Sequence, residues 1–334
     1  MQETTNLLDV ERMSVEFNVQ AGRVRALDDV SLSLRQGEVL SLVGESGSGK
    51  STFALAVSRL LAPNAIVSKE TTILYRGIDI MKIKRSKMDR LRGTEIFMIF
   101  QNPFMSLNPL MRIKDQIREA ITVRDRRSES RRAGELEVEI ASILKSVRIG
   151  DAEDVMQRYP HQLSGGQNQR IMLAMALAEK PSLLIADEPT TALDVTTQAQ
   201  VLSLIKEAIK ETGMSMLFIT HDLAVATSIS DRIAVLYGGM VQEISSAKQI
   251  VLDPKHPYTI GLMKSIPEKS KKDGHLDAIK GSFSLAGLES MCAFYPRCPL
   301  AHSACKEAIP ALLPVESDRY VRCVNFAEGR ESNG

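Results

Sequence analysis

The chain of 334 residues is 44% hydrophobic and 25% charged, which is typical of a folded soluble protein and excludes intrinsic disorder, collagen and a minimal disulfide scaffold. Its 42 Lys and Arg against 41 Asp and Glu leave a net charge of +1, so no global basic excess indicates a nucleic-acid coat. No apolar run approaches the ~20 residues of a membrane-spanning helix. The acidic N-terminus lacks the positive start and apolar core of a signal peptide, so we expect a cytosolic protein.

The first part of the chain has the pattern of β structure. Apolar and polar residues alternate over 13–17 and again over 30–34, which predicts half-buried strands. The apolar run 39–43 predicts a buried strand that ends at a glycine-rich segment. The helical pattern that follows extends to Leu61, and Pro63 marks its end.

Residues from about 102 to 165 differ in character from those before them. The stretch 124–132 is rich in arginine but has acidic neighbours, so we interpret it as a solvated face. A helical stripe follows over 136–147. We therefore predict a mostly helical subdomain here, inserted into a domain formed by residues 1–250.

Strand-like apolar runs return over 183–186, 216–219 and 233–236. An amphipathic helix is predicted between the first two, and it ends at Gly213. Strands that alternate with helices predict a parallel sheet with helices on its faces, which is an α/β fold.

The composition changes again after about residue 250. Seven of the 13 prolines lie between Pro254 and Pro314. We predict an irregular C-terminal extension over 251–334, with a charged linker at 269–274 and a disordered end at 328–334.

The glycine-rich segment 44–51 has the pattern G-x-x-x-x-G-K-S between a predicted strand and a predicted helix. Its glycines let consecutive backbone N–H groups surround phosphate oxygens, and the helix N-terminus adds a favourable dipole. Lys50 would bridge the terminal phosphates, and the Ser51 hydroxyl would ligate Mg²⁺. The predicted nucleotide contacts here are the residue after this segment, Thr52, and the segment's own Gly44, Glu45, Ser46, Gly47, Ser48, Gly49, Lys50 and Ser51.

Two further segments carry phosphate chemistry. The buried strand predicted over 183–186 leads into adjacent carboxylates, where Asp187 suits the metal and Glu188 suits the attacking water. The segment LSGGQ precedes a helical run, so it forms a second anion nest at a helix N-terminus. Its candidate ATP contacts are Ser164, Gly165, Gly166 and Gln167.

The combination of GESGSGKS, LSGGQ, LLIADEPT, the Ala-Leu-Asp run ending at Asp194 and Thr220-His221 resembles the ATP-binding subunit of ABC transporters. The resemblance covers about residues 7–250. It implies an ATPase with the ABC type of P-loop NTPase core, including an N-terminal antiparallel β subdomain. Asp194 belongs to the implied ATP site.

The resemblance assigns roles to three more residues. Phe17 is similar to the aromatic that stacks on adenine, although a strand phenylalanine is usually core. Gln101 is similar to the glutamine that reaches metal and water, and His221 to the histidine that contacts the γ-phosphate. A histidine after a strand is otherwise usually structural. The family mechanism also implies that two ATPase subunits close head to tail, with Ser164 and Gly166 capping ATP in the opposite subunit.

The segments 101–109 and 256–259, together with the C-terminal cysteines, resemble the oligopeptide/dipeptide importer branch of this family. The implied partners are a second ABC ATPase subunit (identical or related), two integral membrane permease subunits and an extracytoplasmic solute-binding protein. The implied location is the cytoplasmic face of the cell membrane.

Alternatives to a peptide importer remain. Relatives of this branch also move oligosaccharides or metal chelates. A different class is a soluble ABC ATPase acting on nucleic acid or ribosomes, but the chain lacks a long coiled-coil insertion and a second phosphate loop. A regulatory module without hydrolysis is disfavoured because Glu188, Gln101 and His221 are all present.

The four cysteines all lie in the C-terminal extension, at Cys292, Cys298, Cys305 and Cys323. A cytosolic chain rarely keeps disulfides, so the clustering indicates a metal or cluster site. The intervals match neither a zinc knuckle nor a ferredoxin, yet four thiolates can ligate one [4Fe–4S] cluster. The resemblance adds that some members of the branch hold one. Zinc and reduced structural thiols remain alternatives; His302 could be a ligand or an exposed histidine.

Overall fold

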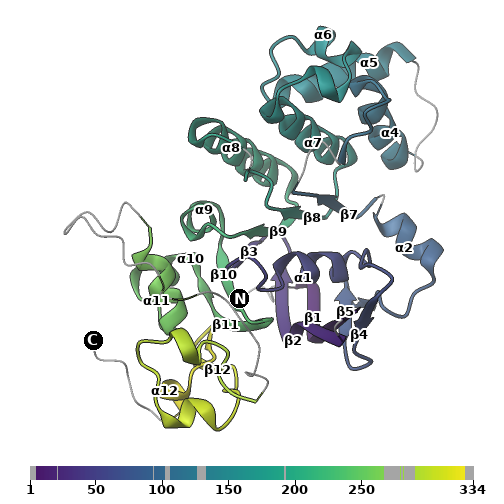
Figure 1. The fold of residues 1–334 in the computed structure, drawn as a ribbon. Helices are drawn as coiled ribbons and strands as arrows, with labels where there is room; N and C mark the ends of the chain where they lie inside the picture. The colour runs from purple at the N-terminus through teal and green to yellow at the C-terminus, as the bar shows by residue number, and fades with distance from the viewer. Residues whose placement is uncertain are drawn as a thin grey trace. The chain divides into compact units, whose positions relative to one another are not determined.

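The computed structural model is an α/β protein (Figure 1). It describes residues 5–20, 22–92, 94–101, 106–125, 133–191, 193–266, 279, 281 and 290–327. Two compact units form. Unit one contains residues 1–7, 35–37 and 82–217, and unit two contains 8–34, 38–81 and 218–334. The boundary falls inside β9 (Ser215–Thr220).

Unit two begins with an antiparallel sheet. Its strands are β1 (Asn6–Val19), β2 (Gly22–Arg35), β4 (Ala65–Val67), β5 (Thr72–Tyr75) and β6 (Ile78–Asp79). The order is β2-β1-β5-β6, and β4 also pairs with β1. Alternate side chains of β1, such as Met13 and Val15, are fully buried, because successive side chains of a strand point to opposite faces.

The second set of strands in unit two is mixed. β3 (Val39–Val43) pairs in parallel with β10 (Arg232–Tyr237), with Leu40 opposite Arg232. β11 (Met240–Ser246) is antiparallel to β10, and β13 (Arg319–Val321) and β12 (Leu313–Glu316) extend the sheet from β11. All five residues of β3 are buried, as expected for a strand covered on both faces.

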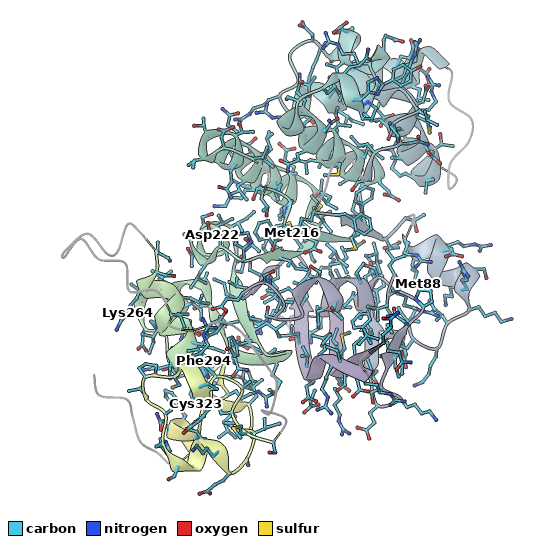
Figure 2. All side chains as sticks on the ribbon, viewed as in Figure 1. Met88, Met216, Asp222, Lys264, Phe294 and Cys323 are labelled. Atoms are coloured by element: carbon cyan, nitrogen blue, oxygen red, sulfur yellow. The ribbon has the colours of Figure 1, made fainter. Side chains whose placement is uncertain are left out.

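Short helices complete unit two. They are α1 (Lys50–Val57), α9 (Leu223–Ile229), α10 (Ala247–Leu252), α11 (Pro257–Lys264) and α12 (Val324–Ala327), with 3₁₀ turns η2 (Tyr295–Arg297) and η3 (Ser303–Lys306). One apolar cluster joins β3, β10 and α9 to α11 and to Phe294, a side chain labelled in Figure 2. The C-terminal extension therefore shares a core with the strand that precedes the glycine-rich loop.

Unit one is largely helical. Its elements are α2 (Arg85–Arg92), β7 (Ile96–Ile99), α4 (Ile113–Asp125), α5 (Ala133–Ser146), α6 (Ala152–Gln157), η1 (Pro160–Gln162), α7 (Gly165–Glu179), β8 (Leu183–Asp187) and α8 (Val195–Thr212). β7 and β8 pair in parallel. α4 packs against α5, α6 and α7 (Figure 1). Gly213 ends α8 in a left-handed conformation, as its position predicts.

The predicted α/β fold class, with an antiparallel β subdomain and a helical insertion, is confirmed. Two local predictions need correction. α1 ends at Val57 rather than Leu61, because Arg59 adopts a positive φ of 51° that a helix cannot continue through. The extension, which was predicted to be irregular because it is rich in proline, also contains the antiparallel β12–β13 hairpin.

Some predictions fall wholly or largely outside the described residues: the linker at 269–274, the C-terminal end at 328–334 and most of the basic stretch 124–132. The division into domains at residue 250 stays a prediction, since compact units are not functional domains. Within the described part of the chain, no helix has both the length and the apolar character needed to cross a membrane.

Candidate functional site

At two of its glycines, the loop between β3 and α1 lies too close to neighbouring backbone to accommodate a Cβ. A Cβ on Gly44 would lie 2.1 Å from the carbonyl oxygen of Leu236, and one on Gly49 would lie 2.5 Å from that of Ala26. Gly49 also has φ of +104°, a conformation that favours glycine. The loop is thus a narrow backbone cradle at the N-terminus of α1, which suits an anion.

The polar groups of this loop indicate that its ligand is an anion. Lys50 is 5% exposed, and its Nζ donates to the carbonyl oxygens of Gly44 (2.8 Å) and Glu45 (2.9 Å). Ser48 is fully buried, and its Oγ has no hydrogen-bond partner among the described residues. A buried ammonium and an unsatisfied hydroxyl beside a helix N-terminus fit an anionic oxygen ligand such as phosphate.

In unit one, two acidic residues follow one another at the end of β8. Asp187 is buried as the last residue of the strand, and Glu188 follows with a positive φ of 46°. Gln101 Nε2 donates to Glu188 Oε2 at 3.0 Å, and Thr191 Oγ1 donates to the same oxygen at 2.9 Å. Such backbone strain in a non-glycine residue is characteristic of functional sites. The contact of Thr191 was missed by sequence analysis, although its position three residues after Glu188 was a usable signal.

The LSGGQ segment begins α7 with a capping box. Ser164 Oγ accepts from the Gln167 N–H at 3.3 Å, and Gln167 Oε1 accepts from the Ser164 N–H at 3.0 Å. A Cβ on Gly166 would lie 3.1 Å from Cγ2 of Thr197. The predicted helix N-terminus is confirmed, and its first turn is held by its own side chains.

This segment lines a polar groove of about 580 Å³ in unit one. The groove also contains Asp194, which caps α8 by accepting from the Thr197 N–H at 3.0 Å, and that hydrogen bond lowers the pKa of its carboxyl. Arg148 and Arg170 also line the groove. The groove therefore brings together Ser164 and Asp194, two predicted ATP contacts, with two cations that sequence analysis did not single out.

Phe17 and His221, the two remaining residues predicted to contact the nucleotide, lie in unit two, as does Lys50. Phe17 is half-buried in β1, opposite Ala65 of β4. His221 is exposed directly after β9, and Asp222 caps the following helix α9. Their nucleotide roles stay predictions.

The four cysteines form no disulfide, and burial raises the pKa of the Cys292, Cys298 and Cys323 thiols. Burial raises the pKa of the Cys298 thiol to about 12 and the pKa of the Cys323 thiol to about 11. Besides burial, the negative charges of Cys292, Cys323 and Cys305 contribute to the raised pKa of Cys298, so the four side chains share one region. Among the described residues, which include all four, no three His, Cys, Asp or Glu side chains are arranged to hold a metal ion. His302 is half-buried and bonded to Asn325 at 2.8 Å, so it is not an exposed histidine.

Two protein families match parts of this chain. Residues 27–191 match the family described as ABC transporter, and residues 242–305 match the family described as oligopeptide/dipeptide transporter, C-terminal region. The second match covers α11, η2 and the first three cysteines.

Curated relatives extend over nearly the full chain. A putative peptide import ATP-binding protein of Brucella ovis is 42% identical over 96% of this chain and 98% of its own length. The oligopeptide transport ATP-binding protein OppD of Escherichia coli is 41% identical over 92% of this chain and 90% of its own. The dipeptide transport ATP-binding protein DppD of Haemophilus influenzae is 41% identical over 95% and 94%.

Solved structures show the same fold. A dimeric ATP-binding cassette in a post-hydrolysis state, bound to ADP and phosphate, matches 72% of this chain and 98% of its own with a TM-score of 0.64 and 28% identity. The glycine-rich cradle, the second helix cap and the acidic strand end follow one another along the chain in that order. The chain therefore belongs to the ATP-binding proteins of ABC transporters.

Proposed function

We propose that this protein hydrolyses ATP to power the import of oligopeptides or dipeptides. The observation that carries the proposal is that one chain combines the phosphate cradle of an ABC ATPase with a C-terminal region typical of oligopeptide/dipeptide transporters. Relatives more than 40% identical over nearly the whole chain are named for peptide, oligopeptide or dipeptide import or transport.

The residues divide the chemistry between them. Lys50 and the cradle N–H groups bind the phosphates, Phe17 stacks on adenine and His221 contacts the γ-phosphate. Ser51, Gln101 and Asp187 would hold Mg²⁺, which neutralises developing charge on the phosphates. Glu188 orients the attacking water and accepts its proton. The contacts from Gln101 and Thr191 to one oxygen of Glu188 support this role, since they aim the carboxylate.

The groove in unit one binds ATP held by a second subunit. Ser164, Gly165, Gly166, Gln167 and Asp194 line it, and the dimeric state of the solved cassette supports such an arrangement. ATP then forms part of the interface between the two ATPase subunits. ATP binding therefore brings the two subunits together, and ATP hydrolysis lets them separate.

The pair docks on two integral membrane permease subunits at the cytoplasmic face of the cell membrane. A solute-binding protein outside the membrane delivers the cargo. Residues 1–250 form the ATPase domain, with the helical subdomain at about 102–165, and residues 251–334 form the extension.

The first experiment is affinity purification from gently solubilised native membranes, followed by identification of the co-purifying chains. Two multi-span proteins and a second ATPase are expected. Vesicles containing that complex should take up labelled peptide with ATP, and the Glu188→Gln complex should not. Uptake of an oligosaccharide or metal chelate in place of peptide would overturn the cargo, and recovery with ribosomes or nucleic acid would overturn the transport function.

The [4Fe–4S] cluster at the four cysteines also belongs to this proposal. Four thiols that share one region support it, whereas their geometry does not form a ready metal site. Iron and acid-labile sulfide should be found in anaerobically purified protein. Zinc in their place, or neither metal, would refute the cluster.

A further inference from the structure

The C-terminal extension reaches the phosphate loop through Glu45. The Arg297 guanidinium forms a fork with this carboxylate, with Nη1 to Oε2 at 2.7 Å and Nη2 to Oε1 at 3.1 Å. The side chain of Arg297 is 7% exposed and that of Glu45 28%. A bidentate, partly desolvated ion pair is stronger and more directional than a solvent-exposed one.

The backbone of Glu45 is held from the same side. Its N–H donates to the Tyr258 hydroxyl at 2.9 Å, and Tyr258 of α11 is fully buried. The rings of Tyr237, Tyr258 and Phe294 pack with centroids 4.6 to 5.3 Å apart. Arg297 lies over the Tyr237 ring, with Cζ 5.7 Å from its centroid. The aromatic cluster thus aligns both groups that hold Glu45.

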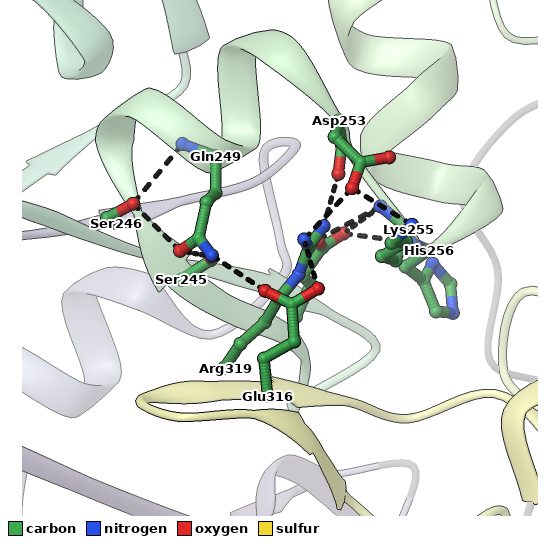
Figure 3. Close-up of polar contacts among 9 residues, drawn as sticks. Ser245, Ser246, Gln249, Asp253, Lys255, His256, Glu316 and Arg319 are labelled. Atoms are coloured by element: carbon green, nitrogen blue, oxygen red, sulfur yellow. Dashed lines mark hydrogen bonds and ion pairs between the residues drawn. The ribbon is translucent and has the colours of Figure 1, made fainter.

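The start of α11, which carries Tyr258, adjoins a polar network around His256 and Arg319 (Figure 3). His256 caps α11, since its Nδ1 accepts from the Tyr258 N–H at 3.0 Å. Burial lowers the pKa of His256 to about 3, so the ring stays neutral and keeps this acceptor. The His256 N–H donates to Glu243 at 2.8 Å, and Glu243 is paired with the buried Arg319 at 3.3 Å. The start of α11 is therefore tied to β11 and β13.

Glu45 in turn contacts the residue that would bind phosphate. Its carbonyl oxygen accepts from Lys50 Nζ at 2.9 Å and from the Ser48 N–H at 3.2 Å. A shift of Glu45 would move the carbonyl that orients the ammonium, and would loosen the cradle. The structure links Arg297 to Lys50 through this single intermediate.

We propose that Arg297 is a positioning residue for ATP binding, which holds the phosphate loop in its binding geometry through Glu45. This proposal rests on the proposed role of residues 44–51 in binding ATP. Arg297 directly precedes Cys298, so the cysteine-bearing segment places the side chain that sets the loop. We expect Arg297 to increase the affinity for ATP by preorganising the loop, because a loop that already has its binding conformation loses less conformational freedom when ATP binds.

The test measures the Kd for ATP of the full-length chain, in a Glu188→Gln background that prevents turnover. Arg297→Ala should raise the Kd about tenfold, and Arg297→Lys should recover only part of the loss because it lacks the fork. Arg124→Ala is the matched control. Arg124 is also a partly buried arginine, paired with Asp125 at 2.8 Å and with Glu139 at 3.1 Å, and its loss should leave the Kd unchanged.

A double-mutant cycle separates positioning from general loss of structure. In a Glu45→Gln background, Arg297→Ala should add little to the Kd, because the pair is already broken. In the native Glu188 background, KM should rise while kcat is kept. An undiminished effect of Arg297→Ala in the Glu45→Gln chain, or a Kd equal to that of the control, would overturn the proposal.

Lys50→Ala tests the proposed function separately. It should abolish ATP binding whether or not Arg297 matters. If Lys50→Ala binds ATP normally, the site itself is wrong; if it fails to bind while Arg297→Ala binds as the control does, only the positioning role is wrong. Thermal unfolding of each variant confirms that the comparison is between folded chains.

Discussion

Glu179 offers a test of how burial affects this protein. It is the last residue of α7 and only 5% exposed. Burial raises the pKa of its carboxyl from the ordinary 4.5 to about 7, because the charged form is poorly solvated there. Replacement by Gln keeps the size of the side chain and removes the titration.

The free energy of unfolding depends on pH because the folded chain holds the Glu179 proton more tightly than the unfolded chain does. The unfolded chain releases it near pH 4.5, whereas the folded chain keeps it until about pH 7. Between these values the folded state binds more protons, so the free energy of unfolding falls as the pH rises. Each pH unit costs about 1.4 kcal/mol, which gives a loss of about 3 kcal/mol by pH 8.

Urea unfolding at pH 5 and pH 8 measures this effect. Glu179→Gln should be close to the parent chain at pH 5 and more stable by about 2 to 3 kcal/mol at pH 8. Glu211→Gln, the same substitution at an exposed position on α8, is the matched control. The same stability difference at both pH values would refute the reasoning, since only a titrating group makes the difference depend on pH.

Three more substitutions have defined outcomes. Glu188→Gln should lower kcat at least about a hundredfold and leave ATP binding intact; unchanged turnover would remove it from the mechanism. Gly44→Ala should abolish ATP binding, since its Cβ would lie 2.1 Å from a carbonyl oxygen, while Gly134→Ala, whose Cβ meets none of the described atoms within 4 Å, should bind normally. Arg319→Met should cost about 3 to 5 kcal/mol in urea unfolding because Glu243 is left buried without its cation, and adding Glu243→Gln should recover most of that loss; no recovery would argue against the pair.

Local patterns in this sequence carried much of the fold. The strand over 39–43 was predicted with the bounds that the structure has, because every residue in it is apolar or small and a loop of glycines follows. The cap at Ser164 and the end of α8 at Gly213 were also predictable, since capping depends on residues a few positions apart. The hairpin β12–β13 was not, because Pro314 breaks the strand pattern there.

The sequence by itself determined the phosphate cradle of this protein, because the loop between β3 and α1 is made by consecutive residues with fixed steric needs. Only the tertiary structure decided what holds that cradle. Arg297 lies 252 positions from Glu45, and nothing in the local pattern of either residue indicates the other. Their pairing depends on how α11 and Phe294 pack on β10, and such long-range packing is set by the shape of the whole core rather than by neighbouring residues.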